Sequence, residues 1–130
     1  MSDDRPDRVY GVIVRDGRVF VTHHGIQRGL PGGVFRKLAE DRKVELRAHL
    51  ATQLGIEARA VWAQGAFFYR HPAEEREYFS GFYSVWEFEG EPSAGAGEWL
   101  SADEVRASLM PAPIRILLTS VLNTAASKTT

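Results

Sequence analysis

The segment that most constrains the fold is residues 29–58, GLPGGVFRKLAEDRKVELRAHLATQLGIEA. It opens with closely spaced glycines, which allow a tight turn. It continues with a pattern that predicts one amphipathic helix from about Ala39 to Leu54. Leucines recur at every fourth position, as on the buried face of a helix: they are Leu46, Leu50 and Leu54. Gly55 follows directly, in the position where glycine usually ends a helix.

Two runs rich in β-branched residues precede this segment, at 9–14 and 18–22. They are separated by Asp16-Gly17, a dipeptide that predicts a tight hairpin because glycine adopts the positive φ that such turns require. Further strand-like runs follow the helix at 58–62, 66–69 and 78–88. The last run is almost entirely apolar or aromatic, as expected of a strand that is covered on both faces.

The C-terminal third predicts two more helices. Ser101 and Glu104 have the spacing of a capping box, which predicts a short helix, and residues 114–122 read as a terminal apolar helix. This order of strands and helices predicts the α+β class, with a mixed β-sheet covered by helices on both faces. We expect a single domain at 9–123, between a flexible N-terminus at 1–8 and a disordered tail at 124–130.

Composition argues against several classes of function. The 130 residues include sixteen basic and seventeen acidic side chains, a formal net charge of −1 and no long block of like charge. This balance favours neither a nucleic-acid nor a membrane surface, and no apolar run approaches the ~20 residues that span a bilayer. The chain has no cysteine, which excludes disulfides and thiolate metal sites and fits a cytoplasmic protein.

Consecutive glycines ahead of a helix also suggest an anion site. Backbone N–H groups at Gly32 and Gly33 can approach a phosphate closely, and the helix N-terminus adds partial positive charge. These two glycines are therefore candidate substrate-binding residues. The alternative is that they only form a tight turn.

The same segment resembles the signature of the Nudix hydrolase (MutT-like) family. The resemblance rests on Leu30-Pro31-Gly32-Gly33, on a glutamate at Glu40 and on a helix that ends Leu54-Gly55-Ile56. It extends to the flanks, because the opening hairpin and the stretch GEWLSADEV are similar to family elements. The resemblance implies a Nudix-like α/β/α sandwich. It also implies hydrolysis of a nucleoside diphosphate linked to another group, with Mg²⁺ or Mn²⁺ held by helix glutamates.

The signature's metal-binding glutamates are absent from this helix. Anchored on Gly55 and Ile56, these positions hold His49, Thr52 and Gln53. Neutral side chains cannot offset the charge of a hard divalent cation, so we assign no metal ligand. We expect hydrolysis to be weak or lost and the domain to bind a nucleotide or a partner. The alternative is an active divergent hydrolase with relocated ligands, using Mg²⁺ or Mn²⁺.

The candidate catalytic residues are Glu40, Glu45 and His49. Glu45 and His49 lie one helical turn apart and form either a substitute site or an ordinary surface ion pair. Glu40 either takes part in the site or orients the loop and caps the helix.

Other residues are candidates for binding. His24, at the end of the second predicted strand, and Glu98 are candidate substrate-binding residues. The acids of the loop at 74–77 are the best source of a relocated carboxylate, and otherwise form a solvated charge run. Aromatic residues at 67–69 and 79–86 supply either a base-stacking platform or the core. A homodimer in which a partner chain supplies acids is a further possibility.

Overall fold

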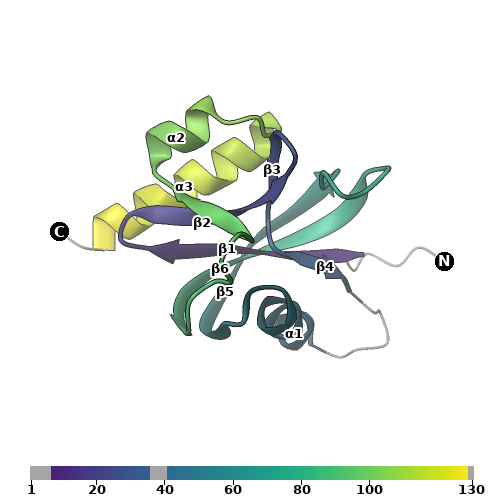
Figure 1. Ribbon diagram of the computed structural model, residues 1–130, viewed down its shortest axis with the longest axis horizontal. Helices are drawn as coiled ribbons and strands as arrows, with labels where there is room; N and C mark the ends of the chain where they lie inside the picture. Colours follow the sequence, from purple (N-terminus) through teal and green to yellow (C-terminus); the bar gives the residue numbers. More distant parts are fainter. Residues whose placement is uncertain (1–6, 36–40, 129–130) are drawn as a thin grey trace.

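The computed structural model describes residues 7–35 and 41–128. Figure 1 shows its strands and helices. The strands are β1 (Arg8–Arg15), β2 (Arg18–His24), β3 (Gln27–Gly29), β4 (Gly32–Val34), β5 (Glu57–Tyr69), β6 (Tyr78–Glu89) and β7 (Gly97–Leu100). The helices are α1 (Arg42–Leu54), α2 (Ala102–Ala107) and α3 (Ala112–Lys128). No helix of the described segments combines the length and the apolar character needed to cross a membrane.

The sheet is mixed, as predicted, and β1 organises it. The main strand order is β3-β2-β1-β6-β5, while β4 pairs with β1 and β7 pairs with β2. β1 runs parallel to β6 and antiparallel to both β2 and β4. It contacts β4 through residues 8–10 and β2 through residues 14 and 15. The glycine-rich segment 29–33 is thus divided between β3 and β4 and belongs to the sheet.

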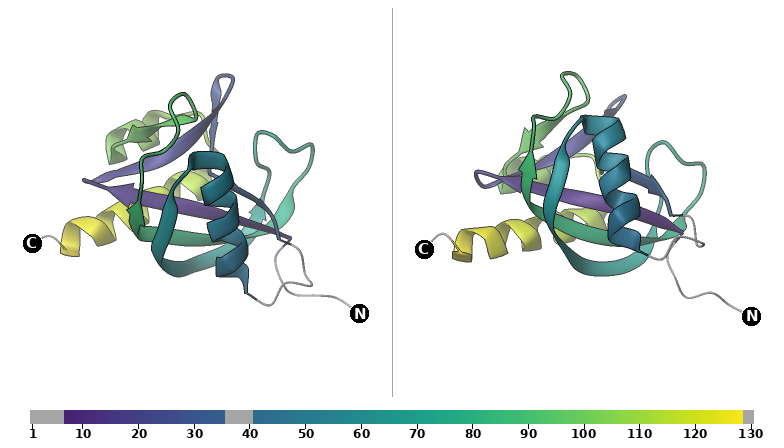
Figure 2. Two further views of the ribbon diagram at one scale, coloured as in Figure 1. Left: turned by 60° about the horizontal axis from the view of Figure 1, so that its bottom comes forward. Right: turned by 90° about the horizontal axis from the view of Figure 1, so that it is seen from below.

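Helices cover both faces of the sheet, which confirms the predicted α+β class (Figures 1 and 2). Alternate residues of β1 point to opposite faces: Val9 and Ile13 pack with the leucines of α1, and Tyr10 and Val12 pack with α3. The buried residues that α1 contributes are Leu46, Leu50 and Leu54, together with Glu45. The predicted helical stripe is therefore the face that covers the sheet.

Turns and caps follow the local sequence. Asp16 and Gly17 both have positive φ, 52° and 73°, as the predicted hairpin requires. Asp41 caps α1 by accepting a hydrogen bond from the Lys43 N–H at 2.8 Å. Gly55 ends α1 in the left-handed conformation, with φ 74°. The structure therefore begins the helix at Arg42 rather than near Ala39, and Glu40 lies outside the described residues.

Two elements extend beyond their predicted limits. Residues 58–62 and 66–69 belong to one strand, β5, in which the pairing with β6 shifts between Ala63 and Gly65. Gly65 has φ 144°, and the two predicted runs are joined through a bulge within one strand. α3 continues to Lys128, and it includes most of the segment that was assigned to the tail. The capping box of Ser101 and Glu104 is present at α2.

Candidate functional site

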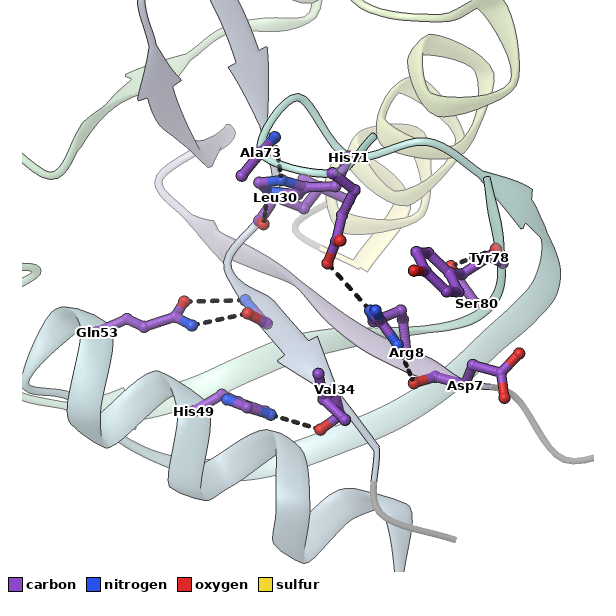
Figure 3. Close-up of polar contacts among 12 residues, drawn as sticks. Asp7, Arg8, Leu30, Val34, His49, Gln53, His71, Ala73, Tyr78 and Ser80 are labelled. Atoms are coloured by element: carbon purple, nitrogen blue, oxygen red, sulfur yellow. Dashed lines mark hydrogen bonds and ion pairs between the residues drawn. The ribbon is translucent and has the colours of Figure 1, made fainter. Parts of the chain in front are cut away.

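The polar face of α1 lies against β4 (Figure 3). Glu45, His49 and Gln53 follow one another at intervals of four residues, so they share this face. The Gln53 amide pairs with both backbone groups of Gly32: the Gly32 N–H donates to Oε1 at 3.0 Å, and Nε2 donates to the Gly32 carbonyl at 2.7 Å. The side chain therefore pairs with this peptide as a neighbouring strand would.

His49 makes the second connection between α1 and β4. Its Nε2 lies 2.8 Å from the carbonyl oxygen of Val34. A carbonyl only accepts, so Nε2 carries the proton and donates. The ring packs against Gly33, where an added Cβ would lie 3.1 Å from the His49 Cε1. We call the hydrogen bonds of Gln53 to Gly32 and of His49 to Val34 the α1–β4 staple.

Gly32 is required by packing against β1. Its φ is 146°, and a Cβ at this position would lie 2.1 Å from the Val9 carbonyl oxygen. Its N–H already donates to Gln53. The close approach of two chain segments therefore accounts for this glycine, and binding of substrate by Gly32 and Gly33 stays a prediction.

The side chains at the expected metal positions do not fit a hard divalent cation. Such a cation requires several oxygen ligands, mostly carboxylates. Here the His49 Nε2 is a donor, the Gln53 amide is engaged at both ends, and Thr52 is an exposed hydroxyl. Glu45 is a buried residue of α1. Within residues 7–35 and 41–128, no three histidine or acidic side chains are grouped so as to hold a metal ion.

His24 and Glu98 lie on the paired strands β2 and β7 but have different neighbours. His24 Nε2 is 2.7 Å from Thr22 Oγ1, and burial lowers the pKa of His24. Glu98 accepts a hydrogen bond from Arg28 Nε at 2.6 Å and lies 3.4 Å from His23. The hydrogen bond from Arg28 lowers the pKa of Glu98. The structure thus places Glu98 with His23 rather than with His24.

His71 is a buried residue that the sequence did not single out. Its Nδ1 accepts from the Ala73 N–H at 3.0 Å, so its Nε2, 3.0 Å from the Leu30 carbonyl, must donate. Only the neutral ring satisfies both bonds. Burial lowers the pKa of His71 to about 4, and the ring stacks on Tyr10 with centroids 5.3 Å apart. His71 therefore ties the β5–β6 loop to the connection between β3 and β4 (Figure 3).

The charged loop between β5 and β6 is anchored at a second point. Glu74 accepts from Arg8 Nε at 3.1 Å, and the Arg8 guanidinium lies 3.7 Å from the centre of the Tyr78 ring. Of the candidate loop acids, Glu74 therefore has a structural partner on β1.

A pocket of about 600 Å³ lies between β3, the end of β5 and the α2–α3 connection. We call it the β3–β5 pocket. Its apolar wall includes Phe68, which is 64% exposed, whereas Tyr69 and Phe82 belong to the core. Its polar lining includes Arg28, Arg70, Arg115 and Glu77. Most of the predicted aromatic platform is thus core, and Phe68, whose ring also contacts Phe79, is an exposed ring in the pocket lining.

The arginines of the β3–β5 pocket differ in their partners. Arg28 is paired with Glu98, and Arg115 donates to the Met110 carbonyl. Arg70 is exposed and forms no ion pair with any residue in the described part of the chain. An open guanidinium beside an exposed aromatic ring suits a ligand that combines an anion with a planar ring.

This architecture resembles solved structures of Nudix hydrolases. A MutT Nudix hydrolase from Burkholderia pseudomallei is 23% identical, with a TM-score of 0.67, and the match covers 86% of this chain and 94% of that chain. A MutT protein from Bacillus halodurans is 20% identical, with a TM-score of 0.73, over 91% and 82% of the two chains. A UDP-X diphosphatase is 14% identical, with a TM-score of 0.67, over 97% of this chain and 66% of that chain.

No protein-family model and no curated protein matches the sequence. The structural matches nevertheless agree with the resemblance seen in the sequence of residues 30–56. The chain has a Nudix-like α+β fold.

Proposed function

We propose that this protein binds a nucleotide or a nucleoside diphosphate derivative without hydrolysing it at the usual metal site. The α1–β4 staple is the observation that carries this proposal. Two of the three positions that would supply metal-binding carboxylates hold His49 and Gln53 instead, and both side chains are hydrogen-bonded to the backbone of β4. The helix face therefore stabilises the fold at the place where a hydrolase would hold its metal.

The ligand is assigned to the β3–β5 pocket. The exposed ring of Phe68 offers a stacking surface for a base, which contributes ~1–3 kcal/mol in nucleic-acid complexes. The guanidinium of Arg70 offers paired donors for phosphate oxygens. The pocket volume of about 600 Å³ falls within the range of ~300–1,000 Å³ that is usual for small-molecule sites.

The structural relatives support the class of ligand. Several are described as Nudix or MutT proteins, and one as a UDP-X diphosphatase, an enzyme named for a nucleoside diphosphate derivative. In this chain the Nudix-like scaffold supplies a pocket for such a ligand, and the staple replaces the metal chemistry.

Thermal unfolding with a ligand panel tests the binding role. The panel contains ADP-ribose, dinucleoside polyphosphates, nucleotide sugars and nucleoside triphosphates, each with EDTA and with Mg²⁺. A ligand at ~100 times its Kd stabilises the folded protein by about 2.7 kcal/mol, which raises Tm by several degrees. We expect this shift in EDTA, its loss in Phe68→Ala and Arg70→Ala, and its retention in Arg106→Ala, an exposed arginine of α2 outside the β3–β5 pocket.

The same panel is assayed for hydrolysis with Mg²⁺ and with Mn²⁺. Metal-dependent turnover by the natural protein, abolished by His49→Ala, would overturn the proposal and support the divergent hydrolase. An unchanged Tm across the whole panel would also overturn the nucleotide-binding role and would favour binding of a protein partner.

A further inference from the structure

We infer that β5 forms an antiparallel, two-fold symmetric pair with β5 of a second copy of this chain. β5 is the last strand of the sheet, and it pairs with β6 on one side only. Figure 2 shows it curving along the outer margin of the sheet. The other peripheral strands, β3, β4 and β7, are three or four residues long, whereas β5 has thirteen residues. Among the described strands, β5 thus offers the longest open edge.

The edge of β5 has little of the protection that isolates most edge strands. Natural sheets block their edges with charges, prolines, bulges or short strands, because open backbone groups recruit other strands. Residues 60–69, AVWAQGAFFY, contain no charge and no proline. Trp62 is 59% exposed and Phe68 is 64% exposed. The pairing with β6 is irregular at two places in this stretch, between Ala60 and Val61 and between Ala63 and Gly65.

Charges at the two ends of β5 favour a second copy as the occupant of this edge. Glu57 begins the strand and Arg70 follows its last residue. Both are exposed, and neither forms an ion pair with any residue of the described segments. An antiparallel pair centred between Ala63 and Gln64 places Glu57 of each copy opposite Arg70 of the other. The strand is thus complementary to itself, as an isologous two-fold interface requires.

The same arrangement makes the interface compact and specific. Residues 58–69 lie between the two ion pairs, and their one charged side chain, Arg59, pairs with Glu89 of β6 in the same copy. Trp62 comes opposite Gly65, which leaves space for the indole. The bulge shifts the pairing by one residue, ~3.4 Å along a strand, and the long arginine side chain can span this shift. Arg70 also lines the β3–β5 pocket. Because a guanidinium has five N–H donors, it can hold Glu57 of the second copy and an anionic ligand together.

The oligomeric state in solution, measured without ligand, tests this inference. Light scattering and sedimentation velocity are run on the full chain from about 1 µM to about 1 mM, the range of weak to moderate affinities. We expect the mass to rise with concentration from 14.5 kDa to twice that value. Trp62→Lys places a charge within the uncharged stretch and should leave a monomer. Ile116→Lys, at a residue of α3 that is 68% exposed, is the matched control and should leave the dimer intact.

Charge exchange tests the register. Glu57→Arg and Arg70→Glu each replace two attractions with two repulsions, so each should weaken the dimer by about tenfold or more. The double variant, with both substitutions, should restore the affinity of the natural chain. All of these residues are exposed, and circular dichroism confirms that each variant is folded. A monomer throughout the concentration range, a dimer unaffected by Trp62→Lys, or a double variant that stays weak would each overturn the inference.

Discussion

Replacing Gln53 by glutamate alters the α1–β4 staple at a single atom. The amide Nε2 that donates to the Gly32 carbonyl at 2.7 Å becomes a carboxylate oxygen, which can only accept. The hydrogen bond from the Gly32 N–H to the other side-chain oxygen is kept. Two oxygens then face each other across the former hydrogen bond. The substitution that introduces a carboxylate at this position should therefore destabilise the protein.

The magnitude follows from the contact that is lost. One hydrogen bond contributes ~0.5–1.5 kcal/mol, and facing two acceptors adds to this cost. Gln53 is exposed, so water screens the repulsion. We expect the free energy of unfolding to fall by about 1–2 kcal/mol near neutral pH, and Tm to fall by roughly 4–8 °C in a chain of this length.

The effect should disappear in acid. A protonated carboxyl group has one donor and one acceptor, as the amide has, so it can satisfy both backbone groups of Gly32. The folded state therefore raises the pKa of the introduced carboxyl above its unfolded value of ~4.3. A carboxyl group with a raised pKa stabilises the folded state most when it is protonated. Its stabilising contribution is therefore fully present below pH ~4.3 and is lost as pH rises through the folded-state pKa.

Urea unfolding measures this effect. The natural protein and the variants Gln53→Glu and Thr52→Glu are compared at about pH 7.5 and at about pH 4. Thr52→Glu is the control. It adds the same charge to the last turn of α1, where an anion is unfavourable, but at an exposed residue outside the staple. If Gln53→Glu costs no more than Thr52→Glu at pH 7.5, or if its cost persists at pH 4, the reasoning about the staple is wrong.

Two further predictions follow from buried contacts. The folded-state pKa of His71 is about 4, below the unfolded value of ~6.5, so its contribution to stability is complete above ~6.5 and is lost as pH falls towards 4. Urea unfolding between pH 7 and pH 4 should show this loss as a fall in the free energy of unfolding of at most ~1.4 kcal/mol per pH unit. If His71→Asn has the same pH profile as the natural protein, His71 is not the source of this pH dependence. Gly32→Ala should lower Tm far more than Gly17→Ala, because only the added Cβ at Gly32 meets a backbone oxygen; equal effects in thermal unfolding would contradict this packing.

Local sequence predicted the elements that depend on neighbouring residues. The Asp16-Gly17 turn, the leucine stripe of α1 and the Gly55 cap all depend on backbone preferences or on spacings of three and four residues. The glycine pattern and the helix end were enough to indicate the fold. The limits of β5 and α3 were wrong because a bulge and the packing of a helix end depend on contacts with other elements.

The partners of the site residues could not be read from the chain. Gln53 bonds to a peptide 21 residues away, His71 to a carbonyl 41 residues away, and the β3–β5 pocket joins three separate segments. The sequence determined that positions 49, 52 and 53 of α1 hold His, Thr and Gln rather than glutamate, because that is a matter of residue type at fixed spacing. Only the tertiary structure decided that His49 and Gln53 bind the backbone of β4, because their partners are brought within reach by the pairing of β4 with β1 and the packing of α1 on the sheet.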